Sequence, residues 1–153
     1  MSPAAGAAQL EIEVEKTVEE INAAAISRGD RALNVMRNCA LEVLGHDGSG
    51  RVYRNGHVAS SPGSPPAPDT GSLRRNWSQQ KLIGGNGGGV RIILRMRSQM
   101  FYAHFIDQGT RRMAPRPFTK PIEQKALPQV AALFSNILEE ICLTKFFTAT
   151  ALN

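Results

Sequence analysis

The residue types of a hydrolase triad occur in the middle of the chain. His57, Ser60, Ser61 and Asp69 could supply a nucleophile, a base and an orienting carboxylate for attack on a carbonyl carbon. All of them lie in a segment rich in Gly, Ser and Pro, whereas catalysis requires groups that are fixed to within about half an ångström. No pair of carboxylates stands in an apolar setting either. We therefore expect no catalytic residue and no enzymatic activity.

Two further patterns bear on cofactors. His46, His57 and His104 have no mutual spacing that suits a metal ion. The glycine-rich run at 84–89 is followed by no Lys-Ser or Lys-Thr and fits no G-x-G-x-x-G register. It predicts the tip of a hairpin rather than a phosphate-binding loop. We expect neither a metal nor another cofactor.

The composition is that of an ordinary globular domain. The 153 residues are 42% hydrophobic and 20% charged, and we expect one domain over residues 1–153. No apolar run approaches the roughly 20 residues that span a bilayer, and the N-terminus lacks the basic and apolar regions of an export signal. Cys39 and Cys142 stand at apolar positions of predicted helices, as reduced core cysteines of a cytosolic protein do.

The net charge of +5 is distributed unevenly along the chain. Residues 1–50 hold 4 basic and 8 acidic side chains, residues 51–125 hold 13 and 3, and residues 126–153 hold 1 and 2. Such asymmetry indicates partners rather than a fold. The candidates are nucleic acid, an acidic protein surface, or the acidic end of another copy of the chain.

The N-terminal third predicts a strand followed by a long helix. Residues 1–8 are Ala, Gly, Ser and Pro with few exceptions, and we expect them to be disordered. Over residues 10–15 apolar residues alternate with Glu, which is the period of a half-buried strand with an acidic outer face. A capping box then begins a helix over 18–44, although Gly29 and Asp30 weaken its middle.

The middle of the chain predicts a long loop. Residues 46–72 are too poor in apolar side chains to offset their ordering entropy, so we expect a mobile loop that reaches a neighbour. A short hairpin with an Asn-Gly turn is compatible with residues 51–58. Asp69 and Thr70 are expected to cap a short helical turn at 71–75, with a leucine as its inward anchor.

A second hairpin is predicted from strands at 77–83 and 90–96. Its second strand has an apolar face and a basic face, made respectively by Val90, Ile92, Leu94 and Met96, and by Arg91, Ile93, Arg95 and Arg97. Basic clusters of this kind neutralise phosphates. No helix-turn-helix, zinc finger or aromatic RNA-binding strand accompanies them, so only non-specific contact with nucleic acid stays open.

A short buried helix is predicted after this hairpin. Phe101 and Phe105 lie one helical turn apart, as do Tyr102 and Ile106, and together they give a wide apolar face. Gly109 supplies the left-handed residue that closes such a helix.

A stiff connection leads to the next helix. Pro115 and Pro117 force an extended path, Phe118 is an apolar anchor on it, and Pro121 suits the first turn of a helix. The anchor stands beside a dense basic cluster, an arrangement that suits docking to another protein: Arg111, Arg112, Arg116 and Lys120.

The chain ends in a helix predicted over 120–147, which Pro128 should kink or divide, and in a frayed tail at 148–153. The fold class is therefore α+β. We expect a small antiparallel sheet on which a long N-terminal helix, a short aromatic helix and a C-terminal helix pack.

Four segments in this order resemble the neck or tail-completion proteins of long-tailed bacteriophages, a family of head-to-tail joining components. They are a Pro-rich run at 61–66, a D-T-G-x-L-R step at 69–74, a helix end Y-A-x-[FY]-[IV]-[DE]-x-G-T at 102–110, and a strap R-P-F-x-x-P at 116–121. The resemblance covers about residues 60–145. It implies that an assembly interface includes the motif residues Asp69, Thr70, Gly71, Leu73, Arg74, Tyr102, Gly109, Thr110, Arg116, Pro117, Phe118 and Pro121.

The resemblance implies a structural virion protein without enzymatic activity. It would form a homo-oligomeric ring, a hexamer or a dodecamer, at the neck of the virion after synthesis in the host cytoplasm. Its partners would be head-closure or connector proteins and tail-terminator or tail-tube proteins, and the genome would pass through the ring without sequence-specific binding. A tail terminator and a head-closure ring are the alternatives within this class. A non-specific nucleic-acid-binding accessory protein is the alternative from another class.

Three hypotheses follow for such a ring. The acidic N-terminal segment of one subunit would face the basic hairpin of the next, and the charges involved would be Glu11, Glu13, Glu15, Glu19, Glu20, Arg91, Arg95, Arg111 and Arg112. The loop at 46–72 would become ordered only in the assembled neck. The arginines would face protein rather than the DNA channel.

Overall fold

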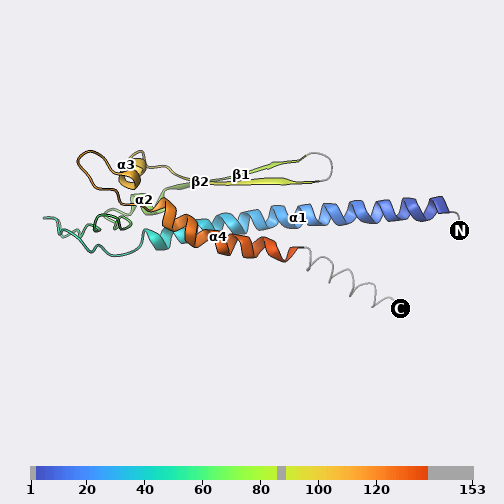
Figure 1. Cartoon of the computed structure of the whole chain (residues 1–153), viewed down its shortest axis with the longest axis horizontal. Coiled ribbons are helices and arrows are strands. Elements are labelled where there is room, and N and C mark those ends of the chain that lie inside the picture. Colours follow the sequence, from blue (N-terminus) through green and yellow to red (C-terminus); the bar gives the residue numbers. More distant parts are fainter. Residues whose placement is uncertain (1–2, 86–88, 138–153) are drawn as a thin grey trace.

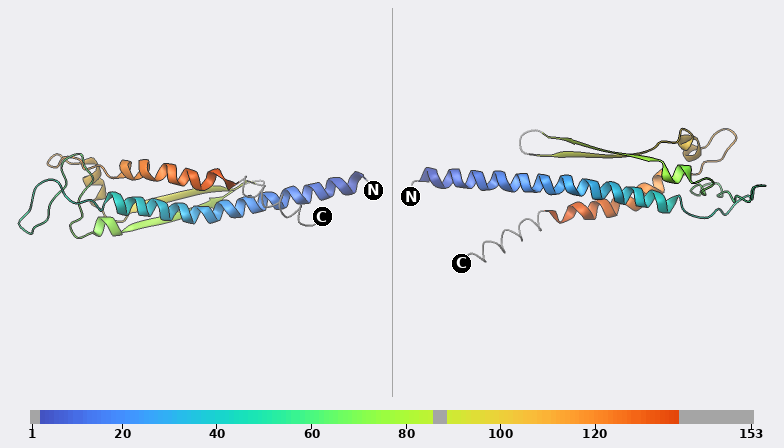
Figure 2. Two further views of the ribbon diagram at one scale, coloured as in Figure 1. Left: turned by 90° about the horizontal axis from the view of Figure 1, so that it is seen from below. Right: turned by 180° about the vertical axis from the view of Figure 1, so that it is seen from behind.

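The computed structural model describes residues 3–85 and 89–137, with side chains from residue 15 onward (Figure 1). The elements, in chain order, are α1 (Pro3–Val43), α2 (Ser72–Arg75), β1 (Trp77–Gly84), β2 (Arg91–Ser98), α3 (Ala103–Gln108) and α4 (Thr119–Ser135). The β1–β2 hairpin lies along one side of α1, and α4 lies along the other side (Figure 1, Figure 2). The predicted α+β class, with a small antiparallel sheet between long N-terminal and C-terminal helices in the sequence, is confirmed.

Helix α1 is a single element of 41 residues, about 60 Å long at 1.5 Å per residue. It replaces both the disordered segment predicted at 1–8, from Pro3 onward, and the strand predicted at 10–15. Helical spacing explains the error, because Leu10 and Val14 continue at four-residue intervals the apolar row that begins the central part of the helix. Extending an existing helix also costs less than starting a strand that has no partner.

Gly29 and Asp30 do not interrupt α1, because they are the place where the hairpin docks. A Cβ at position 29 would lie 3.2 Å from Cδ of Lys81 and 3.5 Å from side-chain carbons of Ile92 and Leu94. The ammonium group of Lys81 lies 2.7 Å from Oδ2 of Asp30. The glycine therefore permits close approach of helix and sheet, and the neighbouring aspartate fixes the strand.

The hairpin has two unlike faces, as predicted. Strands β1 and β2 pair antiparallel in a register that places Trp77 opposite Ser98 and Gly84 opposite Arg91. The face toward α1 carries the partly buried apolar side chains of β2, and Gln79 on it donates a 2.8 Å hydrogen bond to the carbonyl of Leu33. The other face carries the arginines. In the described part of the chain, no helix or third strand covers that face.

The core is thin and lies where the C-terminal half of α1 meets α4 and the segment before α4. Its largest fully buried side chains, among the described residues, are those of Leu44 and Cys39. Alanines fill much of the rest, which brings the helix backbones close together. The buried cluster consists of Cys39, Ala40, Val43, Leu44, Ala103, Phe118, Ile122 and Ala126.

Polar groups also join α1 to α4. Lys125 of α4 forms an ion pair with Glu42 of α1, and the hydrogen bond from this lysine to Glu42 raises the pKa of Lys125. The thiol of Cys39 is buried beside them, and this burial raises its pKa, with a further contribution from the negative charge of Glu42. The predicted reduced core cysteine is therefore found at position 39, whereas Cys142 lies outside the described residues.

The start of helix α4 agrees with the prediction, whereas its course at Pro128 differs from it. Pro121 stands in its first turn, where the missing N–H costs no helical hydrogen bond. A kink or a division was predicted at Pro128, and the helix passes through this residue as one element, so it is not divided there. The helix end predicted at residue 147 and the frayed tail at 148–153 lie outside the described residues. None of the described helices has the length and apolar character needed to cross a membrane.

The aromatic helix is not buried in the way the sequence suggested. Phe101 is 85% exposed and Phe105 is 51% exposed, and only Ala103 in α3 is buried. Tyr102 and Ile106 are half-buried. The turn and α3 are too short to wrap both aromatic rows against the core, so one row faces the core and the phenylalanines face solvent.

Candidate functional site

All four motif segments meet around one cavity of about 260 Å³ beside the C-terminal end of α1. Its walls come from the Pro-rich run, from the step at 69–74, from α3 and from the strap. We use the name strap for residues 114–118, the last three of which begin the motif at 116–121. The motif residues that border it are Asp69, Thr70, Gly71, Leu73, Arg74, Tyr102 and Arg116. The other motif residues, Gly109, Thr110, Pro117, Phe118 and Pro121, do not border it.

Residues 46–72 form part of the wall and have hydrogen-bonded structure of their own. The hairpin proposed at 51–58 is confirmed, because Val52 and Val58 form an antiparallel bridge and Gly56 takes a φ of 80° in the turn. Positive φ is the conformation that an Asn-Gly turn requires. The sequence therefore predicted this small hairpin correctly inside a segment that it otherwise assigned to a mobile loop.

The same segment packs closely against itself and against the strap. A Cβ at Gly48 would lie 1.8 Å from the carbonyl oxygen of Val58, so only glycine fits there. Ala59 is 4% exposed, and the amide of Gly63 donates a 2.9 Å hydrogen bond to the carbonyl of Pro115. Residues 46–71 contain no helix or strand, as a loop should, but the segment already packs within one subunit, which contradicts the expectation that it becomes ordered only in the assembled neck. Backbone contacts made through glycine replace the apolar side chains that the segment lacks.

Two buried polar atoms, in residues that border the cavity, have no hydrogen-bond partner among the described residues. One is Oγ of Ser60, a residue only 5% exposed, and the other is Nε of Arg116. Leaving a buried polar group unpaired costs about 1–3 kcal/mol. Both atoms are enclosed by protein, so this polar deficit lies in the packed surroundings of the cavity rather than in the cavity itself.

The step at 69–74 holds the cavity against α1. Gly71 takes a φ of 74° at the start of α2, which favours glycine there. Arg74 donates a 3.0 Å hydrogen bond from Nε to the carbonyl of Leu41, and Arg75 donates one of 2.9 Å to the carbonyl of Thr70. The predicted inward position of Leu73 is confirmed, because its side chain packs against the buried cluster.

The residues of the rejected catalytic triad come near one another without forming a triad. Nδ1 of His57 lies 3.9 Å from Oδ1 of Asp69, and Ser60 borders the same cavity. The hydroxyl of Ser60 makes no hydrogen bond to the histidine, so no base is in contact with a nucleophile. Asp69 was expected to cap α2, but it pairs with His57, and Thr70 Oγ1 accepts the 3.4 Å hydrogen bond from Ser72 N–H.

Asp107 has a role that the sequence reasoning missed. Its Oδ1 accepts hydrogen bonds from the backbone N–H groups of Phe118, at 2.9 Å, and of Thr119, at 3.1 Å. A carboxylate at this position satisfies the first N–H groups of α4 and interacts favourably with the helix dipole. Asp107 therefore joins α3 to the start of α4 across the strap. The acidic position in the helix-end motif was the one sequence signal that pointed to such a role.

Phe118 anchors the core of its own subunit rather than a partner. Its side chain is 3% exposed and lies edge-on against Trp77, with ring centroids 6.3 Å apart. The strap is also held by a 2.9 Å hydrogen bond from the amide of Arg116 to the carbonyl of Ile106. Phe118 is therefore not available for docking in the folded subunit, and the expectation that it contacts another protein is wrong.

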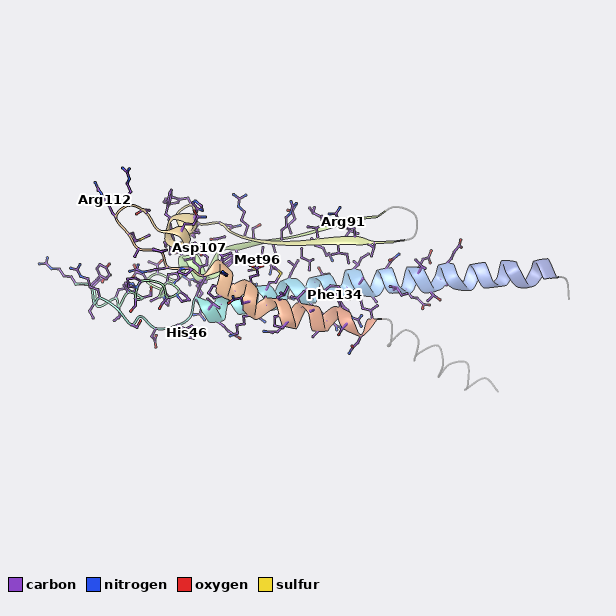
Figure 3. All side chains as sticks on the ribbon, in the orientation of Figure 1. His46, Arg91, Met96, Asp107, Arg112 and Phe134 are labelled. Carbon is purple, nitrogen blue, oxygen red and sulfur yellow. The ribbon has the colours of Figure 1, made fainter. Side chains whose placement is uncertain are left out.

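The basic residues beside the strap lie at an exposed tip. Gly109 ends α3 with a positive φ of 78°, but its ψ of 178° lies outside the left-handed helical conformation that was predicted. A Cβ there would lie 2.8 Å from the carbonyl oxygen of Met113. Thr110 and Met113 close the turn with a pair of backbone hydrogen bonds. Arg111 and Arg112 stand at the exposed end of this turn, where Figure 3 shows Arg112 pointing away from the molecule.

A second surface is the outer face of the hairpin. Arg91, Arg95 and Arg97 are all exposed on it, and the register places them opposite Gly84, Gln80 and Ser78. Ile93 lies between the first two arginines. Lys81, the basic residue of β1, faces α1 and pairs with Asp30, so it does not belong to this face.

The acidic residues lie on the projecting half of α1. Figure 1 shows the N-terminal half of α1 extending past the hairpin ends of β1 and β2, and we call it the projecting half. Glu15 and Glu19 are exposed and four residues apart, and the helical repeat continues this row at position 11. Positions 13 and 20 share a second row, seven residues apart. Positions 11, 13 and 15, predicted on the acidic outer face of a strand, therefore belong to a helix.

The described part of the chain contains no cluster of His, Cys, Asp or Glu that could hold a metal ion. Comparison of the chain with protein-family models, with curated proteins and with solved structures finds no match.

Proposed function

We propose that the chain is a structural component of a phage head-to-tail junction that acts as a ring of identical subunits. The observation that carries this proposal is the uncovered arginine face of the hairpin in a subunit that also projects an acidic helix. A two-stranded hairpin is marginal in water unless it packs on something. Here α1 covers one face only, and the other face remains for a partner.

Charge complementarity selects a second copy as that partner. The outer face carries Arg91 and Arg95, and the projecting half of α1 carries Glu15 and Glu19. The two surfaces differ, so contact between them is heterologous and closes into a ring when the rotation allows. In this arrangement each hairpin lies between its own α1 and that of its neighbour. Rings are also what the motif resemblance implies.

The surface near α3 supports an assembly role as well. Phe101 and Phe105 are large apolar side chains left exposed just before and within α3, and the turn that carries Arg112 follows α3 directly. Exposed aromatic side chains beside basic residues are typical of protein interfaces. We assign this surface to contact with a neighbouring ring, such as a head-closure or tail-terminator component, in the virion neck.

The experiment is to measure the mass of the purified protein by light scattering for wild type and for the double variant Arg91→Glu, Arg95→Glu. We expect a defined oligomer for wild type and a monomer for the variant, because like charges would then face each other. The matched control is Arg51→Glu, Arg54→Glu, which makes the same charge change on an exposed loop. An unchanged oligomer in the first variant would count against this interface.

A second candidate function is non-specific binding to nucleic acid, which the same three exposed arginines favour. Its sign would be a gel shift of duplex DNA that is strong at low salt and falls steeply at moderate salt. Such a shift by a protein that stays monomeric would favour an accessory protein over a ring component.

A further inference from the structure

The small hairpin at 51–58 carries large side chains that the fold leaves exposed. It belongs to the blue-green segment after α1, which reaches the end of the molecule opposite the N-terminus (Figure 1, Figure 2). Val52 is 64% exposed and Tyr53 is 47% exposed. Side chains of this size are stabilised when they leave water, so both of them have surface to offer to a partner.

Backbone hydrogen bonds fix the shape of this hairpin. The amide of Tyr53 donates a 2.8 Å hydrogen bond to the carbonyl of His57, and the amide of Ala59 donates one of 2.9 Å to the carbonyl of Arg51. Gly56 makes the turn with a φ of 80°. Because the backbone is already ordered in the free subunit, binding at this hairpin costs little further conformational entropy.

Three side chains of the hairpin form a stack. The ring of Tyr53 is stacked with that of His57, with centroids 6.0 Å apart and planes at 19°. Cζ of Arg51 lies 5.7 Å from the centre of the Tyr53 ring, which is the distance of a cation–π contact. Nδ1 of His57 lies 3.9 Å from Oδ1 of Asp69, outside the hairpin. The stack therefore holds an aromatic ring and a guanidinium group together at a partly exposed site.

The charge of this part of the chain favours an acidic partner. Residues 48–68 contain two arginines, Arg51 and Arg54, both exposed, and no Asp or Glu. A shallow depression of about 470 Å³ lies beside the stack, and Tyr53, Arg54 and Asn55 are among the residues that border it. A side chain of a partner can enter this space. Guanidinium groups bind carboxylates with matching geometry.

The composition of the hairpin favours a protein over a nucleic acid. Affinity for DNA rises with the number of phosphates that a protein neutralises, and this hairpin has only two arginines. An exposed Val52 gains nothing from phosphate groups, whereas it gains from burial in a protein interface. Tyr and Arg are also the side chains on which the affinity of protein interfaces commonly depends.

We propose that the hairpin at 51–58 is a docking site for a protein partner whose surface has carboxylates around an apolar depression. Tyr53 and Val52 supply the apolar contacts, and Arg51 and Arg54 bind the carboxylates. Every group of this site belongs to one subunit, so the site does not depend on ring formation. In the neck, a location that rests on the function proposed above, the partner belongs to an adjacent ring.

The test is the binding of the full-length protein to labelled polymers, measured by fluorescence anisotropy. The probes are poly-L-glutamate, a random copolymer of Glu and Tyr of the same length, and duplex DNA. We expect the copolymer to bind roughly tenfold more tightly than poly-L-glutamate, because it supplies aromatic rings as well as carboxylates. Duplex DNA should bind more weakly than the copolymer, since its backbone supplies charge without apolar groups.

The informative variants are Tyr53→Ala, Val52→Ser and the pair Arg51→Gln, Arg54→Gln. Each of the first two should reduce the preference for the copolymer severalfold and leave the affinity for poly-L-glutamate nearly unchanged. The arginine pair should weaken binding of both polymers by about fivefold, as loss of two exposed charge contacts gives. If Tyr53→Ala disrupts the stack, Val52→Ser still tests the apolar contact, because Val52 is 64% exposed and lies outside the stack.

The matched control is Arg31→Gln, Arg37→Gln, which removes the same charge from exposed positions of α1. It should weaken both polymers by less than about twofold, and equal losses for the two arginine pairs would overturn the proposal. The same holds for a wild type without preference for the copolymer, and for a preference that survives both Tyr53→Ala and Val52→Ser. Tighter binding of duplex DNA than of the copolymer would replace the protein partner by nucleic acid.

The oligomeric mass separates this proposal from the proposed ring. Light scattering should give the wild-type mass for every hairpin variant, because the hairpin at 51–58 is not the face assigned to contact between subunits. A monomeric wild type that still prefers the copolymer would contradict the ring and leave the docking site supported.

Discussion

Two regions of this molecule differ in how completely their side chains are buried within the subunit. The packed region comprises the C-terminal half of α1, the start of α4 and the strap, and it buries Phe118 and Ile122 to about 5% exposure or less. The open region comprises the outer face of the hairpin, the projecting half of α1, and the exposed pair Phe101 and Phe105. Both regions contain apolar side chains, but only the packed region buries them.

The contrast separates residues that maintain the subunit from residues available to partners. The strap and the helix-end motif were expected at an interface, yet Asp107 and Phe118 are used within the subunit. The arginine face and the phenylalanines have no such use in the described part of the chain. The residues of a short sequence motif can therefore serve the folding of the subunit as well as binding to a partner.

The largest difference between the regions is expected for removal of a phenyl ring. Phe118→Ala should lower the free energy of unfolding by about 3–5 kcal/mol, because it leaves a cavity next to Trp77. Phe101→Ala removes the same atoms from an 85% exposed position and should change it by about 0.5 kcal/mol or less. Urea denaturation of the two variants measures both values. Equal losses would mean that Phe101 is buried in solution, as an assembled interface would make it.

A smaller difference is expected for two aspartates. Asp107→Ala removes the acceptor for two N–H groups at the start of α4 and should cost about 1–2 kcal/mol. Asp30→Ala removes an exposed ion pair with Lys81 and should cost about 0.2–1 kcal/mol. The same denaturation experiment compares them. A larger loss for Asp30→Ala would show that hairpin docking is the more critical contact.

The smallest effect concerns the pKa of Cys39 in the packed region. Burial raises this pKa above the value of 9.0 that the thiol has in the unfolded chain, so the unfolded state loses its proton first as pH rises. The resulting contribution to stability is present below pH 9.0 and is lost as the pH rises through the folded pKa. In a Cys142→Ala background, stability between pH 8 and 10 should fall more steeply with Cys39 than with Cys39→Ala. Parallel curves would contradict the shift.

Several parts of the fold could be predicted because their signals are local. The arginines and apolar residues of β2 alternate with the period of a strand, Pro121 is compatible only with an early helical position, and Asn55-Gly56 specifies a turn. The N-terminal segment was predicted wrongly because alternation at 10–15 is also compatible with a helix. The burial of Phe101 and Phe105 was overestimated because periodicity identifies an apolar face without showing what covers it.

The candidate site could be predicted only in its parts. The four motif segments were identified from the sequence, but nothing local states that Ser60, Arg74 and Arg116 border one cavity, since they come from three separate segments. Asp107 was present in a motif without an assigned role, because the N–H groups that it caps begin eleven residues later.

The sequence by itself determined the uneven charge, the element types from the hairpin onward and the positions where only glycine or proline fits, because these depend on side-chain chemistry and on backbone sterics within a few residues. Only the tertiary structure decided which apolar residues are covered, which carboxylate caps which helix and which donors are left without acceptors. Those properties depend on distances between segments that lie far apart in the chain. Burial and pairing contribute to the free energy of folding only when those segments are in contact.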